Sequence, residues 1–401
     1  MPPAPPIRYR DVLAEPRFRT VFGARSLATA ADTLRTVALS VLIFLATGSA
    51  LLSAIAHGVS FVPQLIGGSL LGALTDRAEP RGLIALGYGV ESAVALLLAT
   101  GATPVWLSLS LVAAIAFVTP VFTGLTGRVI ADVLPGERYA VGRSMSLLAS
   151  SVAQLVGLVG GGGAVALLGS GRALLVSAVL HALACLWVRT RLPVGRPARP
   201  ERTGTVRASW TTNRRLLRDR DLRALIVAQW LPTAAAAGAE GLLIPYAAAR
   251  WAAENASLLL AGLPAGMVVG TVLVGRLVPP GSRDRLVIPL LMLVGAPLMA
   301  FWFPLPFAVA LLLSTVSGVG LAYSVCVQSR FRDLVPVKER GQAFTLLATG
   351  LMTAQGLGPA VFGLLADHTT VSTAVAAAGL VAVVHVVWRG PDVNRVLRAT
   401  T

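Results

Sequence analysis

The feature that most constrains this chain is a series of long apolar runs that carry almost no charge. A helix needs about 20 mostly apolar residues to cross roughly 30 Å of hydrocarbon. Only 13% of the 401 residues are charged and 55% are hydrophobic, whereas a soluble domain carries about 25% charged residues. This number of charged residues is too small to form the polar surface of a water-soluble protein of this size. The sequence therefore predicts a polytopic, all-α membrane protein.

The apolar runs predict twelve transmembrane helices. They are continuously apolar instead of alternating, which favours helices over the strands of a barrel. The sixth run is short, and the arginines that follow it would have to snorkel to the membrane surface. The predicted spans are 20–46, 50–75, 82–102, 104–127, 143–168, 173–188, 222–248, 256–279, 285–303, 305–327, 342–366 and 371–388.

The basic residues predict the orientation of the chain. A net charge of +16 would suggest nucleic-acid binding in a soluble protein, but here the Lys and Arg residues lie in short gaps between apolar runs. Nearly all of them fall on one side of the predicted membrane. By the positive-inside rule both termini are cytoplasmic, and we expect a bacterial plasma membrane, with lipid as a partner and no nucleic acid.

An internal repeat divides the spans into six and six. The segment from Asp132 to Arg138 recurs about 200 residues later, from Asp333 to Arg340, which favours duplicated halves. The arginine-rich segment between the halves is either a solvated tether or a site for anionic lipid headgroups. The predicted organisation is a cytoplasmic arm (1–19), a first half (20–188), a basic linker (189–221), a second half (222–388) and a cytoplasmic tail (389–401).

The connection after the second span carries a recognisable motif. Gly72, Leu74, Asp76, Arg77 and Arg81 resemble the loop signature of the major facilitator superfamily, which has a glycine, a leucine, an aspartate and a basic cluster. The resemblance implies that Asp76 latches the two halves on the cytoplasmic side. The alternative is a turn that only follows the positive-inside rule.

The match to this signature is incomplete at two positions. Glu79 stands where a glycine is usual and Pro80 where a basic residue is usual. Arg128, near the inner end of the fourth span, is expected to be a snorkelling anchor or a latch partner, and a substrate ligand is the alternative.

The resemblance to the superfamily implies a secondary transporter that moves a small solute by alternating access, as a monomer. The segments 127–138 and 333–343 are most similar to those of bacterial multidrug and siderophore exporters. That narrower resemblance implies proton-driven efflux of an amphipathic compound, such as an antibiotic or a siderophore-like metabolite. Import of a nutrient by the same fold and a membrane-embedded sensor or scaffold remain the alternatives.

Four charged residues are predicted to lie within spans, where charges usually face the bundle interior or water. Asp32 lies near the middle of the first span, and Arg35 is three residues on and therefore on the same face. Asp32 either binds the coupling proton, with Arg35 tuning it, or forms a permanent internal salt bridge. Glu91 in the third span and Glu240 in the seventh are further candidates for proton coupling.

Glycines in two spans are candidates for close packing or bending. The fifth span resembles, loosely, the glycine-rich span of drug–proton antiporters, although it lacks the usual Gly-Pro pair. The eleventh span does contain a Gly-Pro pair, which predicts a kink. The residues concerned are Gly157, Gly160, Gly161, Gly162, Gly163, Gly358 and Pro359.

The sequence offers no catalytic constellation. His181, His368 and His385 are expected at or near span ends and form no predicted ligand set. Ser-His-Asp order, nucleotide-binding loops and metal-ligand spacings are not found. We therefore expect a protein that is not an enzyme and that has no cofactor and no metal site.

Overall fold

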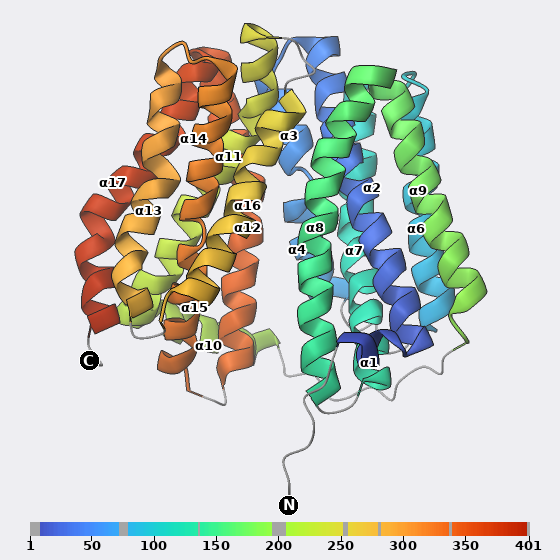
Figure 1. The fold of residues 1–401 in the computed structure, drawn as a ribbon, viewed down its shortest axis with the longest axis horizontal. Coiled ribbons are helices and arrows are strands. Elements are labelled where there is room, and N and C mark those ends of the chain that lie inside the picture. Colours follow the sequence, from blue (N-terminus) through green and yellow to red (C-terminus); the bar gives the residue numbers. More distant parts are fainter. Residues whose placement is uncertain are drawn as a thin grey trace, which may run out of the picture. The chain divides into compact units, whose positions relative to one another are not determined.

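The computed structural model describes residues 9–71, 79–134, 137–194, 206–251, 256–279, 282–336 and 339–398. Every regular element in these ranges is helical (Figure 1). The chain forms two compact units. The first contains residues 1–42 and 63–201, and the second contains residues 43–62 and 202–401. The second unit therefore includes a short segment from the N-terminal part of the sequence.

The helices of unit 1 form a bundle around one apolar core. Helices α6 and α9 pack closely against each other, and α7 lies along α6. The last residues of α2 and the first residues of α4 belong to unit 2. The helices are α1 (Tyr9–Leu13), α2 (Pro16–Thr47), α4 (Phe61–Leu71), α6 (Pro80–Ala99), α7 (Val105–Val133), α8 (Glu137–Leu168) and α9 (Ser170–Arg191).

Unit 2 has its own apolar core. Helix α11 packs against α16 and α17, and α12 packs against α14, while α3 lies against α11 and α16. The helices are α3 (Ala50–Gly58), α10 (Val206–Arg218), α11 (Arg220–Arg250), α12 (Ala256–Leu277), α13 (Arg283–Met299), η3 (Ala300–Trp302), α14 (Phe307–Gly320), α15 (Tyr323–Leu334), α16 (Arg340–His368) and α17 (Val371–Arg398).

Ten segments in the described part of the chain are long and apolar enough to cross a membrane. They correspond to ten of the twelve predicted spans. The seventh and eleventh predicted spans coincide with α11 and α16, which have 31 and 29 residues. At about 1.5 Å per residue, both helices are long enough to cross roughly 30 Å of hydrocarbon.

Several predicted spans differ from the helices observed. The second span is interrupted between α3 and α4, because Pro63 has no N–H to bond the carbonyl of Val59. The tenth span is divided into α14 and α15 by a tight turn in which the N–H of Leu321 bonds the carbonyl of Gly318. The sixth span is not short, since α9 has 22 residues and includes Arg189 and Arg191 in its last turn.

Candidate functional site

The first part of the candidate site lies on α2. Asp32 is sixteen residues beyond the start of this 32-residue helix, and Arg35 follows one turn later. One guanidinium nitrogen of Arg35, Nη2, lies 2.8 Å from Oδ1 of Asp32. The two side chains form a direct ion pair within a single helix face.

The second part comes from α6 and α9, which pack side by side. Glu91 and His181 each lie eleven residues after the first residue of their helices. The hydroxyl of Ser92 donates to the carbonyl oxygen of Ala178 at 2.8 Å, which fixes the register of α6 against α9. Because the helices have similar lengths, this register brings the two central side chains to the same level.

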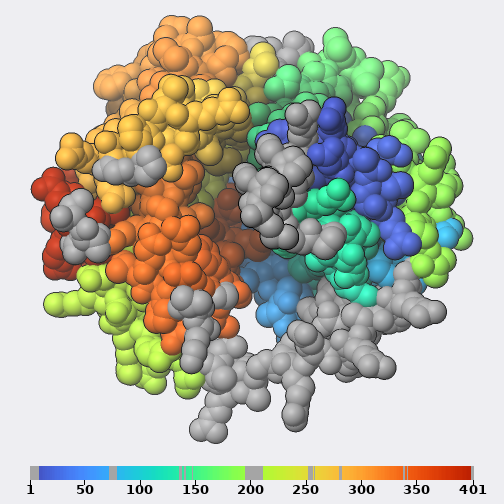
Figure 2. Space-filling model, turned by 60° about the horizontal axis from the view of Figure 1, so that its bottom comes forward, coloured from blue at the N-terminus to red at the C-terminus, as the bar shows by residue number. Residues whose placement is uncertain are grey.

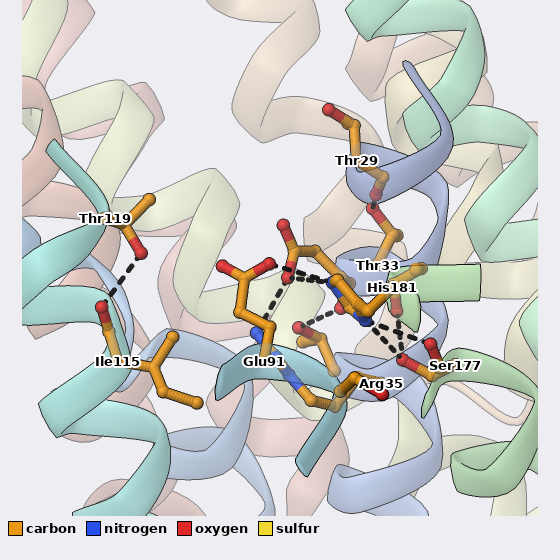
Figure 3. A network of polar contacts seen from close by, with 12 residues as sticks. Thr29, Thr33, Arg35, Glu91, Ile115, Thr119, Ser177 and His181 are labelled. Carbon is orange, nitrogen blue, oxygen red and sulfur yellow. Dashed lines mark hydrogen bonds and ion pairs between the residues drawn. The ribbon is translucent and has the colours of Figure 1, made fainter. Parts of the chain in front are cut away.

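His181 joins the two parts of the site. Its Nε2 atom lies 3.2 Å from Oδ1 of Asp32 and 3.1 Å from Oε2 of Glu91. Figure 3 shows the side chains of Glu91, Arg35 and His181 converging from different helices. Asp32, Arg35, Glu91 and His181 are called the polar network below.

The geometry of the imidazole ring constrains where a proton can be. The Nδ1 atom lies 3.0 Å from the carbonyl oxygen of Ser177. Because a carbonyl only accepts, this contact requires a proton on Nδ1. Nε2 faces two carboxyl groups, so a hydrogen bond there requires a further proton on Nε2 or on Asp32 or Glu91. The polar network therefore contains a position for one exchangeable proton.

The members of the polar network differ in access to their surroundings. His181 is fully buried, and Glu91 is 4% exposed. The side chain of Asp32 keeps 31% of its surface exposed. Asp32 is therefore the most exposed member of the polar network.

The three possible metal ligands of the polar network lie within 4.8 Å of one another, with one atom each from Asp32, Glu91 and His181. The guanidinium of Arg35 already contacts Oδ1 of Asp32 at 2.8 Å. A cation at this position would meet a fixed positive charge that shares its ligand. The arrangement therefore suits a proton better than a divalent metal ion.

The prediction for His181 was wrong in two respects. The residue lies at the centre of α9 and not near its end, and it contacts two acids. Asp32 and His181 are 149 positions apart in sequence. Their contact depends on α9 lying beside α2, which is visible in the bond from the hydroxyl of Ser177 to the carbonyl oxygen of Ala31 at 2.8 Å.

The fourth candidate acid lies in unit 2. Oε1 of Glu240, on α11, is 3.9 Å from Nε2 of His57 on α3. Both side chains are largely buried, with 18% and 12% of their surface exposed. The other ring nitrogen of His57 has no hydrogen-bond partner among the described residues. This contact is longer and less supported than those of the polar network.

The loop motif is only partly visible. Gly72, Leu74, Asp76 and Arg77 lie outside the described residues. Arg81 is in the first turn of α6, where the carboxylate of Glu79 accepts hydrogen bonds from the N–H groups of Arg81 and Gly82. Glu79 and Pro80, the two departures from the family signature, thus serve as the N-cap and the first residue of α6.

Arg128 lies near the end of α7, where its Nε is 3.7 Å from Oδ2 of Asp132 one turn further on. This pair is within one helix.

The glycines of α8 fall on two faces. A Cβ atom on Gly157 would lie 2.5 Å from the carbonyl oxygen of Ala30, and one on Gly161 would lie 3.0 Å from Cα of Leu34. These glycines allow α8 to approach α2 beside the polar network. A Cβ on Gly160 or Gly163 would meet nothing within 4 Å.

The Gly-Pro pair of α16 packs within unit 2. A Cβ on Gly358 would lie 2.1 Å from the carbonyl oxygen of Ala234 on α11. Pro359 lies beside Gly58 of α3 and Gly241 of α11. The pair therefore occupies the place where three helices of this unit meet.

Three solved structures of transporters are similar to this chain over nearly its whole length. One is a bacterial homolog of the human lysosomal transporter Spinster, in an inward-facing and unoccupied conformation. It is 14% identical, with 96% of this chain and 98% of that chain covered and a TM-score of 0.71. The second is the nucleoside transporter NupG, at 13% identity, 94% and 98% coverage and a TM-score of 0.73.

A third similar structure is a POT family transporter in complex with 5-aminolevulinic acid, at 12% identity, 94% and 96% coverage and a TM-score of 0.74. No curated protein matches the sequence. At these identities the structures establish the fold alone. The family model described as Major Facilitator Superfamily matches residues 21–330. The chain therefore belongs to the Major Facilitator Superfamily of secondary transporters, which are integral membrane proteins and not enzymes.

Proposed function

We propose that this protein exports an amphipathic small molecule and that inward proton flow drives the export through the polar network. The observation that carries the proposal is the position of Nε2 of His181, within 3.2 Å of both Asp32 and Glu91. A proton on Nε2 lies within reach of both acids, and the contact with Asp32 has the geometry of a hydrogen bond. With His181 protonated, the two acids balance the charges of His181 and Arg35, so adding or removing a proton changes the net charge of the buried site.

A change of charge in this site has a structural consequence. The polar network joins α2, α6 and α9, and Arg35, Glu91 and His181 in it are buried, so removing one partner leaves a buried charge uncompensated. Loss of one proton or one pair alters how these helices hold together. A contact whose strength depends on charge favours one conformation of these helices over another. Alternating access requires such a difference in free energy between conformations.

Export is the proposed direction on the basis of the exporter-like segments 127–138 and 333–343. The nearest competing function is uptake of a polar nutrient by the same fold. Structural relatives of this chain include a nucleoside transporter and a peptide transporter. Nucleosides and dipeptides therefore belong in any panel of test solutes.

The test follows proton movement in everted membrane vesicles with a pH-sensitive dye. Amphipathic antibiotics, nucleosides and dipeptides are added to vesicles that contain the intact protein. An exported solute that exchanges for protons makes the lumen more alkaline. A solute that enters the lumen together with protons makes it more acidic, and that result would overturn export.

Two substitutions connect this response to the polar network. We expect Asp32→Asn and His181→Gln to reduce the solute-induced pH change at least about tenfold. His368→Gln is the matched control, because His368 is exposed at the end of α16. Equal responses in all three variants would return the polar network to a purely structural role.

A further inference from the structure

A recess in unit 1 opens between α2, α7 and α8, at the end where α2 begins. Its volume is about 600 Å³, within the range of roughly 300–1,000 Å³ that small-molecule sites occupy. Figure 2 shows the end of the bundle at which α2 begins. The dark-blue start of the described chain lies there beside the teal segment in which α7 ends and α8 begins. The recess is separate from the polar network.

Two arginines line the recess, and none of the described residues that line it is acidic. Arg25 is nine residues beyond the start of α2, which places it about 14 Å along the helix axis. Arg143 is six residues beyond the start of α8. Both therefore project from within helices and not from the connections, where the positive-inside rule alone would place them.

Neither arginine forms an ion pair with an acid in the described part of the chain. The hydroxyl of Tyr88 lies near Arg25. Asp32 adds a negative charge in the neighbourhood of Arg25, but its carboxylate is already bonded to Arg35 and His181.

Two hydroxyl groups add hydrogen-bond donors to the same recess. Tyr139 and Ser150 line it, and neither hydroxyl bonds to another group in the described part of the protein. Apolar surface from Phe22 and Ile130 completes the wall. Cationic donors, free hydroxyls and an apolar surface together suit a ligand that has a charged oxygen-rich end and an apolar remainder.

We propose that this recess binds the anionic group, a carboxylate or a phosphate, of an amphipathic ligand, with Arg25 and Arg143 as its cationic contacts. The ligand is a solute on its way through the protein or a lipid headgroup, and both present the same chemistry. Identifying it as a transported solute rests on the proposed function. The binding of the anion does not.

The test measures thermal unfolding of the full-length protein in nanodiscs of phosphatidylcholine, with phenyl phosphate as the anionic probe and phenol as its neutral counterpart. We expect phenyl phosphate to raise the unfolding midpoint and phenol at the same concentration to leave it unchanged. Loss of one charge-assisted contact in Arg143→Gln should weaken the apparent affinity at least about tenfold. Arg25→Gln should have a similar effect.

Arg138→Gln is the matched control, because Arg138 is an exposed residue on the same helix and does not line the recess. Equal stabilisation by phenyl phosphate and phenol would overturn the proposal. So would an affinity for phenyl phosphate that is the same in Arg143→Gln as in the control. Because Arg143 is exposed, its replacement leaves the fold intact even if Arg25→Gln does not fold.

A second arm replaces part of the lipid with phosphatidylglycerol. If a headgroup occupies the recess, phosphatidylglycerol should stabilise the intact protein more than Arg143→Gln and abolish the effect of phenyl phosphate. If the ligand is a solute, the effect of phenyl phosphate should persist. Phenyl phosphate should also bind Asp32→Asn, so that loss of proton-coupled transport and loss of anion binding are separate results.

Discussion

The polar network of unit 1 and the His57–Glu240 pair of unit 2 both bring a histidine and an acid together within the helices, but they differ in the support around them. In the polar network, His181 is 3.2 Å or less from two acids and its second nitrogen contacts a backbone carbonyl. In the pair, His57 is 3.9 Å from one acid, and its second nitrogen has no partner among the described residues.

This difference bears on what each site can do. Arg35 supplies a permanent positive charge to the polar network, so gain or loss of one proton leaves other charges that must rearrange. No arginine or lysine is among the described ion-pair partners of Glu240. The pair joins α3 to α11, so a change of charge there acts on the contact between these two helices. We therefore propose that proton coupling involves the polar network and that the pair has a minor role.

The largest expected effect comes from breaking the polar network at Asp32. Asp32→Asn leaves the buried guanidinium of Arg35 without its carboxylate, which should lower the free energy of unfolding by about 3–5 kcal/mol. The double variant Asp32→Asn with Arg35→Gln should recover most of this loss, because it removes the uncompensated charge. Thermal unfolding in nanodiscs measures both. Proton-coupled transport should stay absent in the double variant.

Recovery of proton-coupled transport in that double variant would contradict the proposed role of the polar network in coupling. It would show that the ion pair holds the fold and that protons move elsewhere.

The second-largest expected effect tests whether the close approach of α8 to α2 positions the polar network. Gly157→Ala places a Cβ 2.5 Å from the carbonyl oxygen of Ala30 and 2.8 Å from Cβ of Thr33, on either side of Asp32. The overpacking should cost about 1–3 kcal/mol of unfolding free energy and reduce transport. Gly160→Ala is the control, because it meets nothing within 4 Å and should be neutral or slightly stabilising. Equal effects of the two substitutions would show that α2 and α8 do not need this close approach.

The helices were predictable from the sequence where a local pattern decides the structure. Ten of the predicted spans correspond to segments that are long and apolar enough to cross a membrane, since apolar length and low charge determine this property. Asp32 and Arg35 could be paired in advance because three residues along a helix bring them to one face. The break at Pro63 was also encoded locally and was missed because hydropathy alone does not show it.

His181 was missed for a different reason. Nothing in the residues around it indicates a polar contact, because its partners lie on two other helices, α2 and α6. Only the packing of α9 beside both helices brings the three residues together. The contact of His57 could not be predicted for the same reason. Its helix, α3, belongs to unit 2, whereas the helices before and after it in the sequence belong mainly to unit 1.

A smaller effect tests the docking of α3, which carries His57. Asp367 on α16 accepts hydrogen bonds from the hydroxyl of Ser49 at 2.9 Å and the N–H of Leu51 at 3.2 Å, at the start of α3. Asp367→Ala should cost about 1 kcal/mol of unfolding free energy, as loss of a helix cap does. Hydrogen exchange should rise in α3 before it rises elsewhere. Asp392→Ala, at a half-exposed acid on α17 whose ion pairs lie within that helix, is the control, and equal exchange in α3 for both variants would show that Asp367 does not hold this helix.

The smallest expected effect comes from removing the charge of Glu240. Glu240→Gln changes one oxygen to an amide at a contact of 3.9 Å, too long for a hydrogen bond, so the free energy of unfolding should change by at most about 1 kcal/mol. Transport should fall by less than about threefold. Glu91→Gln makes the same chemical change at a contact of 3.1 Å within the polar network, and proton-coupled transport should be lost there. If Glu240→Gln abolished the proton response while Glu91→Gln retained it, the coupling site would lie in unit 2. Proton coupling would then depend on Glu240, whose ion-pair partner in the described part of the chain is His57 and not an arginine or a lysine.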